Sequence, residues 1–86
     1  RKYNGLWKND KSLISINGNF LLYNNYLTIK IFSLENENMG YLILKGQDAS
    51  HDYYLDLHML SNREIYIKIK QDNIVLLDTI FKKVGI

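Results

Sequence analysis

The chain contains no cysteine and no proline, and only 5 of its 86 residues are glycine. Without cysteine, no disulfide can stabilise the fold and no thiol can act as a nucleophile or a metal ligand. No apolar run approaches the about 18 residues that a transmembrane helix needs. The formal net charge of +2 is too small to indicate a nucleic acid or an anionic membrane as a partner.

Apolar side chains, in contrast, are plentiful. Hydrophobic residues make up 47% of the chain and aromatic residues 13%, which is sufficient for a core and excludes disorder. We expect one domain spanning residues 1–86, which buries about two thirds of its unfolded surface. The sequence begins with Arg1 rather than Met, so we interpret the chain as a processed or trimmed product.

The clearest pattern is a strict alternation over residues 53–70, with the period of 2 that a strand shows when one of its faces is buried. The apolar set is Tyr53, Leu55, Leu57, Met59, Ile65, Ile67 and Ile69. The polar set is Tyr54, Asp56, His58, Glu64, Tyr66, Lys68 and Lys70. A three-residue loop at 60–62 preserves both sets and pairs Leu57 with Ile65 and His58 with Glu64.

Asparagine-rich turns divide the N-terminal half into strands. Asn17-Gly18 and Asn24-Asn25 predict two-residue hairpin turns between strands at 12–16, 19–23 and 26–34. The two turns agree on one inward face, made by Leu13, Phe20, Leu22, Leu27, Ile29 and Ile31. The polar residues 35–38 predict a loop, followed by a strand at 39–45 that places Leu44 on the inward face.

The C-terminal segment, residues 74–83, follows a third asparagine-ended loop at 71–73. Its apolar residues also fit a helical spacing, so a short C-terminal helix is the alternative, but β-branched residues favour a strand. The whole pattern predicts an all-β fold: an antiparallel up-and-down meander of eight strands, closed or nearly closed into a barrel. A sandwich or an open curled sheet is the competing architecture.

The first predicted strand contains Gly5-Leu6-Trp7. Gly-x-Trp at the start of an antiparallel meander resembles the opening of lipocalin-like (calycin) barrels, in which the Trp closes one end. These barrels also carry an Arg on the last strand that stacks on the Trp, whereas this chain has Lys82 and Lys83 there. The resemblance, shared with small lipoproteins and barrel-shaped inhibitors of the bacterial envelope, implies an extracytoplasmic location in the periplasm or cell envelope.

Few residues suggest catalysis. Ser50-His51-Asp52 has the letters of a triad, but adjacent residues of an extended chain point to opposite sides, so we interpret it as a polar loop. Asp56, His58 and Glu64 could form an oxygen–nitrogen metal site, but three such residues on an exposed surface without a pocket are more often ordinary cross-strand pairs. We therefore expect no cofactor, no metal and no enzymatic activity.

The outward face carries aromatic residues interleaved with lysines. Such a face can stack bases, form a protein interface or simply reflect the strand propensity of Tyr. We predict Phe32, Tyr41, Tyr54 and Tyr66 as contacts of a partner protein. The inward residues are nearly all large, which predicts a packed interior without the ~300 Å³ that a ligand site needs.

Our hypothesis is a non-enzymatic binding module, monomeric or homodimeric, that engages a partner protein as an inhibitor, immunity protein or envelope component. Carriage of a small apolar ligand inside the barrel is the alternative. Nucleic acid is not expected as a partner. A membrane is expected to matter only through an anchor that has been removed.

Overall fold

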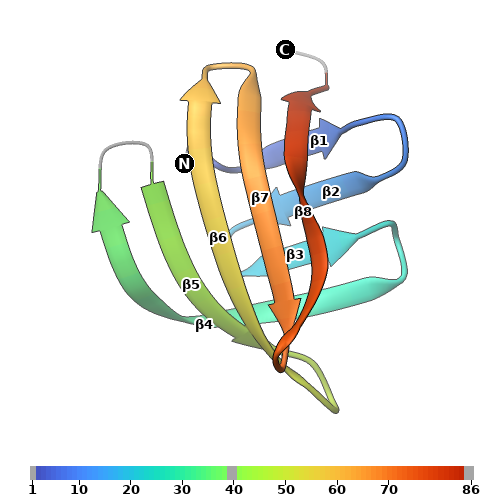
Figure 1. Ribbon diagram of the computed structural model, residues 1–86, viewed down its shortest axis with the longest axis vertical. Coiled ribbons are helices and arrows are strands. Elements are labelled where there is room, and N and C mark those ends of the chain that lie inside the picture. Colours follow the sequence, from blue (N-terminus) through green and yellow to red (C-terminus); the bar gives the residue numbers. More distant parts are fainter. Residues whose placement is uncertain (1, 39–40, 85–86) are drawn as a thin grey trace.

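The structure is a computed structural model that describes the backbone of residues 2–38 and 41–84, and the side chains of these residues outside 35–42. Its strands are β1 (Gly5–Lys8), β2 (Leu13–Asn17), β3 (Phe20–Tyr23), β4 (Leu27–Asn38), β5 (Tyr41–Gln47), β6 (Asp52–Ser61), β7 (Glu64–Gln71) and β8 (Ile74–Lys83). Each strand pairs antiparallel with its neighbour in sequence, and β1 pairs with β8, so the sheet closes into a barrel (Figure 1). The predicted all-β, up-and-down barrel is confirmed, and the C-terminal segment is a strand.

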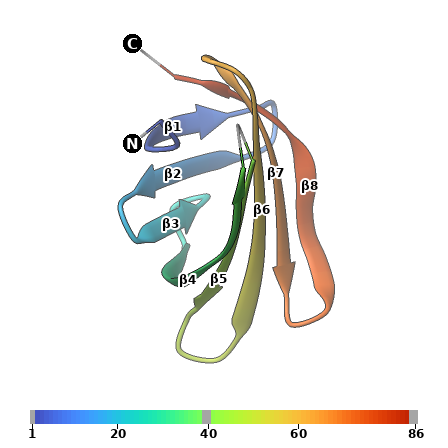
Figure 2. The same cartoon turned by 90° about the vertical axis from the view of Figure 1, so that its left-hand side faces the viewer.

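The barrel is built from two groups of strands that cross. Strands β5 to β8 follow the long direction of the molecule, whereas β1, β2 and β3 run across it, and β4 bends from one direction to the other (Figures 1 and 2). The seam that closes the barrel is short, because within the described residues β1 pairs with β8 only at Trp7–Lys83 and Lys8–Lys82. The N–H of Val84 adds a hydrogen bond to the Leu6 carbonyl at 2.8 Å. Within the described residues, no helix is long and apolar enough to cross a membrane.

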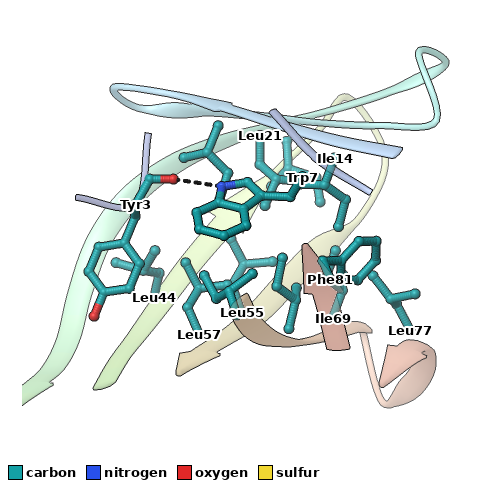
Figure 3. Packing of buried hydrophobic residues seen from close by; sticks show 14 of the residues in the cluster. Tyr3, Trp7, Ile14, Leu21, Leu44, Leu55, Leu57, Ile69, Leu77 and Phe81 are labelled. Atoms are coloured by element: carbon teal, nitrogen blue, oxygen red, sulfur yellow. Dashed lines mark hydrogen bonds between the residues drawn. The ribbon is translucent and has the colours of Figure 1, made fainter. Parts of the chain in front are cut away.

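The interior is filled by large apolar side chains from every strand (Figure 3). Trp7 is completely buried, and its Nε1–H donates a hydrogen bond to the Tyr3 carbonyl at 3.0 Å. The residues predicted to face inward are buried on β4 to β7: Ile29, Leu44, Leu55, Leu57, Ile65, Ile67 and Ile69. For these strands the predicted inward face is confirmed.

The turn between β3 and β4 has three residues rather than the predicted two. Asn24 and Asn25 adopt left-handed φ values of 53° and 63°, and Tyr26 completes the turn before Leu27, which pairs with Tyr23. Asn enters this region more readily than most residues. Because successive side chains of a strand alternate between faces, one additional residue in the turn exchanges the inward and outward faces of β3 relative to the prediction.

The core therefore receives the opposite set of side chains from β2 and β3. The prediction that Leu13, Phe20 and Leu22 face inward is wrong, and Phe20 is 50% exposed. The buried residues of these two strands are Ile14, Ile16 and Leu21. The β3 sequence FLLY is apolar on both faces, so alternation alone did not distinguish its inner from its outer face. In the β2 sequence LISIN, Ser15 and Asn17 lie on the same face as Leu13 and mark it as the outer one, but the predicted turn register overrode this signal.

The hairpin between β6 and β7 has a two-residue turn at 62–63 and a bulge just before it. A two-residue turn plus one bulged residue has the same parity as the predicted three-residue loop, so the inward face is as predicted while the register moves by two residues. His58 consequently lies opposite Tyr66, and the predicted His58–Glu64 pair is wrong. The β7–β8 hairpin, with its turn at 72–73 and a bulge, repeats this arrangement.

The loop predicted at residues 35–38 is also wrong, because these residues belong to β4. Strand β4 pairs with β3 only as far as Lys30 and then continues along β5, with two bulges. The first bulge falls at Phe32, between Ile31 and Ser33. Beyond β3, β5 is the one strand neighbour of β4 among the described residues, so a polar sequence does not prevent it from continuing.

Candidate functional site

Two of the predicted partner contacts line the same surface. Phe32, on the bulge of β4, and Tyr54, on β6, border an open groove of about 280 Å³ together with Lys45, which pairs with Tyr54 across β5 and β6. Phe32 is 58% exposed and Tyr54 39% exposed. The remaining lining residues are Gly46, Asp52, Tyr53 and Asp72. We call this surface the aromatic groove.

The other two predicted contacts lie outside the aromatic groove. Tyr66 packs edge-to-face against His58 with ring centroids 5.5 Å apart, and its hydroxyl donates to Asp78 at 2.5 Å. The Tyr66 side chain therefore belongs to a cluster of side chains from β6, β7 and β8 on the outer face. Tyr41 opens β5, with His58 as its backbone partner, but its side chain lies outside the described residues.

A polar cluster closes one end of the barrel at the β5–β6 loop. The Tyr53 hydroxyl donates to Asp48 Oδ2 at 2.6 Å and accepts a hydrogen bond from Gln71 Nε2 at 2.8 Å. The backbone N–H groups of Ser50 and His51 donate to Asp48 Oδ1 at 2.8 and 2.7 Å. The hydrogen bond from Tyr53, followed by that from Ser50, lowers the pKa of Asp48, whereas burial is the main cause that raises the pKa of Tyr53.

The Ser50-His51-Asp52 segment lies beside this cluster but has no triad geometry. His51 Nδ1 is 2.9 Å from Asp72 Oδ2, on the β7–β8 turn, rather than near Asp52. Ser50 contributes its backbone N–H to Asp48. Within the described part of the chain no hydrogen bond joins Ser50 to the His51 ring, so the group serves to fix the loop.

The residues considered as a metal site are only partly brought together. His58 Nε2 lies 3.1 Å from Asp56 Oδ1 on the same face of β6. Glu64, displaced by the register, pairs with Ser61 and Lys82 instead. In the described residues, no three His, Cys, Asp or Glu side chains form a group able to hold a metal ion.

A small cavity lies where interior side chains meet the β2–β3 turn. It measures about 40 Å³ and is lined by residues that include Ile16, Ile31, Leu44 and Leu57. This volume is far below the roughly 300 Å³ of a typical ligand site. The cavity has room for a solvent-sized guest only.

A larger groove, which the sequence analysis missed, runs beside β8. It measures about 590 Å³ and lies between the β1–β2 turn and the middle of β8. Its lining comprises residues 8–12, 76–80 and Lys82, and we call it the β8 groove. It exists because β8 has ten residues and β1 only four, a difference that no local pattern indicates.

The Gly-x-Trp segment occupies the seam of the barrel. Gly5 has a φ of 141°, and a Cβ atom there would lie 3.0 Å from Cε of Lys83. The Nζ of Lys83 lies 5.5 Å from the centroid of the Trp7 ring, which is a cation–π distance. Lys83 thus covers Trp7 from the last strand.

These features define the class of the protein: a closed, eight-stranded antiparallel barrel, consistent with a calycin-like architecture. Comparison of the chain with family models, curated proteins and solved structures gives no match. Its function has to be argued from its own surfaces.

Proposed function

We propose that this protein is a non-enzymatic binding module whose aromatic groove engages a partner protein. The observation that carries the proposal is the exposure of Phe32 and Tyr54 at one groove, with Lys45 between them. Aromatic side chains are enriched in the core of protein interfaces, and Tyr is among the residues that dominate the binding energy there. The cavity beside the β2–β3 turn measures only about 40 Å³, and large side chains fill the interior among the described residues, which supports the outer surface rather than a carried ligand as the basis of function.

We also propose that the barrel is lipocalin-like. Gly5 and Trp7 match the opening of such barrels, and Lys83 covers the indole where the family has an Arg. An extracytoplasmic location follows from the same resemblance. Fractionation of cells that produce the natural protein, followed by immunodetection, tests the location separately from binding.

Site-specific photo-crosslinking in the source cells tests the partner proposal. A photoreactive phenylalanine at position 54 is expected to capture one partner, whereas the same group at Thr28, exposed at the N-terminal end of β4 and absent from the groove lining, captures none. With that partner purified, Phe32→Ser and Tyr54→Ser should each weaken binding about tenfold or more, as expected for central interface aromatics. Equal capture from both positions, or unchanged affinity of both variants, would refute the proposal.

The carrier alternative has its own assay. Titration with an apolar fluorescent probe, followed through Trp7 emission, should give no saturable one-to-one binding. Micromolar binding that a bulky substitution at Leu55 abolishes would restore the carrier, because Leu55 is completely buried inside the barrel.

A further inference from the structure

One edge of β8 is largely without a strand partner. Strand β8 extends over Ile74–Lys83, but β1 pairs only with Lys82 and Lys83. Figures 1 and 2 show β1 meeting β8 near the C-terminal end of the strand. Residues 76–80 of this strand line the β8 groove, and unpaired strand edges are templates for another strand.

Hydrogen bonds that are present show which backbone groups face the groove. The Val84 N–H points to β1, where it meets Leu6, and the Ile80 carbonyl accepts from Asn9 Nδ2 at 3.4 Å on the same side. The Lys83 N–H points the other way, towards the Arg63 carbonyl. Because successive residues of a strand alternate in direction, Ile80 and Asp78 present their N–H and C=O groups to the groove.

The β1–β2 turn forms the opposite wall of the β8 groove and is held by its own hydrogen bonds. Asn9 Oδ1 accepts the N–H groups of Lys11 and Ser12 at 2.9 and 2.8 Å, which fixes the β1–β2 turn. Nδ2 of Asn9 also donates a hydrogen bond to the Ile80 carbonyl, so this backbone acceptor on the edge of β8 already has a partner from the turn. Ile80, 48% exposed, adds an apolar contact on the β8 side.

The charge around the groove is unbalanced. Lys8 lies directly opposite Lys82 across the seam, and Lys11 stands on the turn. Glu64 is the backbone partner of Lys82 on β7, but none of these three lysines forms an ion pair with any described residue. Like charges directly opposite each other destabilise a strand pair, so carboxylates placed here would relieve a repulsion. Two carboxylates, Asp10 and Asp78, also line the groove. Asp78 already accepts a hydrogen bond from the Tyr66 hydroxyl.

We infer that the β8 groove binds an extended, acidic segment of a partner protein, which adds as a strand to the free edge of β8. Main-chain hydrogen bonds to Asp78 and Ile80 supply affinity, and the three lysines select acidic side chains. The β8 groove and the aromatic groove share no lining residue. Either site can therefore fail its test without affecting the other.

A titration of the isotope-labelled 86-residue chain, followed by amide NMR, tests this inference. The probes are two synthetic peptides, one alternating glutamate and valine and one alternating lysine and valine. The acidic peptide should shift the amide signals of Asp78 and Ile80 saturably and bind at least about tenfold more tightly than the basic one. Absence of shifts at these amides, or equal affinity for both peptides, overturns the inference.

Charge-reversed variants provide the matched control. The double variant Lys8→Glu with Lys11→Glu should weaken binding of the acidic peptide about tenfold or more, whereas Lys30→Glu with Lys45→Glu, exposed on β4 and β5 and absent from the lining of the β8 groove, should leave it nearly unchanged. Both variants change the net charge equally, so a general electrostatic effect would weaken binding in both and overturn the inference. Sedimentation without peptide completes the test, because a dimer disrupted by Ile80→Lys would assign the edge to a second copy instead.

Discussion

Replacing Gly46 with Ala should destabilise the barrel through crowding between β4 and β5. A Cβ atom at this position would lie 2.5 Å from Cγ2 of Ile29 and 3.0 Å from the carbonyl oxygen of Lys30. Ile29 is completely buried and branched at Cβ, so it cannot move aside without disturbing the core. Overpacking typically costs about 1–3 kcal/mol, and the stiffer unfolded chain returns about 0.4–1 kcal/mol. The net loss should be about 1–2 kcal/mol, which lowers the melting temperature by about 5–15 °C in a domain of this size.

A double-mutant cycle with Ile29→Leu makes this reasoning testable, because leucine lacks the Cγ2 methyl group. Urea unfolding monitored by Trp7 emission should show that Gly46→Ala costs at least about 0.5 kcal/mol less in the Ile29→Leu background than in the wild type. Gly18→Ala is the control: its φ of 59° makes alanine strained, but no atom lies within 4 Å of the added Cβ. Its cost should be independent of Ile29. If Gly46→Ala is as stable as the wild type, or additive with Ile29→Leu, the crowding argument is wrong.

Three further predictions concern the core, the β5–β6 loop and the seam. Ile67→Ala should cost about 2–5 kcal/mol in urea unfolding, because Ile67 is completely buried; a cost below about 1 kcal/mol would show that the site is loosely packed. Asp48 has a lowered pKa in the folded state, so its stabilising contribution is present above its unfolded pKa of about 3.9 and is lost as pH falls through the folded pKa. Unfolding midpoints of Asp48→Asn should therefore lie below the wild type at pH 7 and converge with it in acid, and a gap that is constant with pH would contradict the lowered pKa. Lys83→Met should cost about 0.5–1 kcal/mol and change Trp7 emission, whereas Lys82→Met should leave the emission unchanged.

Much of the fold could be predicted from the sequence because β6 and β7 alternate without interruption. Polar and apolar positions on these strands differ so clearly that Leu55 and Ile67 have only one plausible side to face. The register between β6 and β7, in contrast, could not be predicted. A three-residue loop and a two-residue turn with one bulge give the same inward face, and only the cross-strand distances in the folded chain distinguish them.

The inward face of β3 could not be predicted from alternation, since both of its faces are apolar, and the inward face of β2 was assigned from its pairing with β3. The prediction rested on turn length alone, and two adjacent left-handed asparagines, Asn24 and Asn25, lengthened the turn by one residue. Leu22 and Phe20 then faced outward rather than inward. Ser15 and Asn17, on the same face of β2 as Leu13, were the sequence signal that this face points outward.

The candidate sites, too, could be predicted only in part. Exposure of Phe32 and Tyr54 could be predicted, because alternation places them away from the core, but their meeting at one groove depends on the bulge in β4. The β8 groove could not be predicted, since it results from the unequal lengths of two strands at opposite ends of the chain. Its lysines, Lys8 and Lys82, are distant in sequence and become neighbours only when the barrel closes.

The short seam between β1 and β8 has a consequence for how the barrel folds. Every other strand pairing joins neighbours in sequence, so each hairpin can form after closing only a small loop. The seam alone requires nearly the whole chain to be enclosed, and the entropy cost of closing a loop rises with its length. We therefore expect the meander to assemble first and the ring to close last. The same pairing should open first in the native state, so the Val84 amide should exchange its hydrogen well before the amide of Ile67.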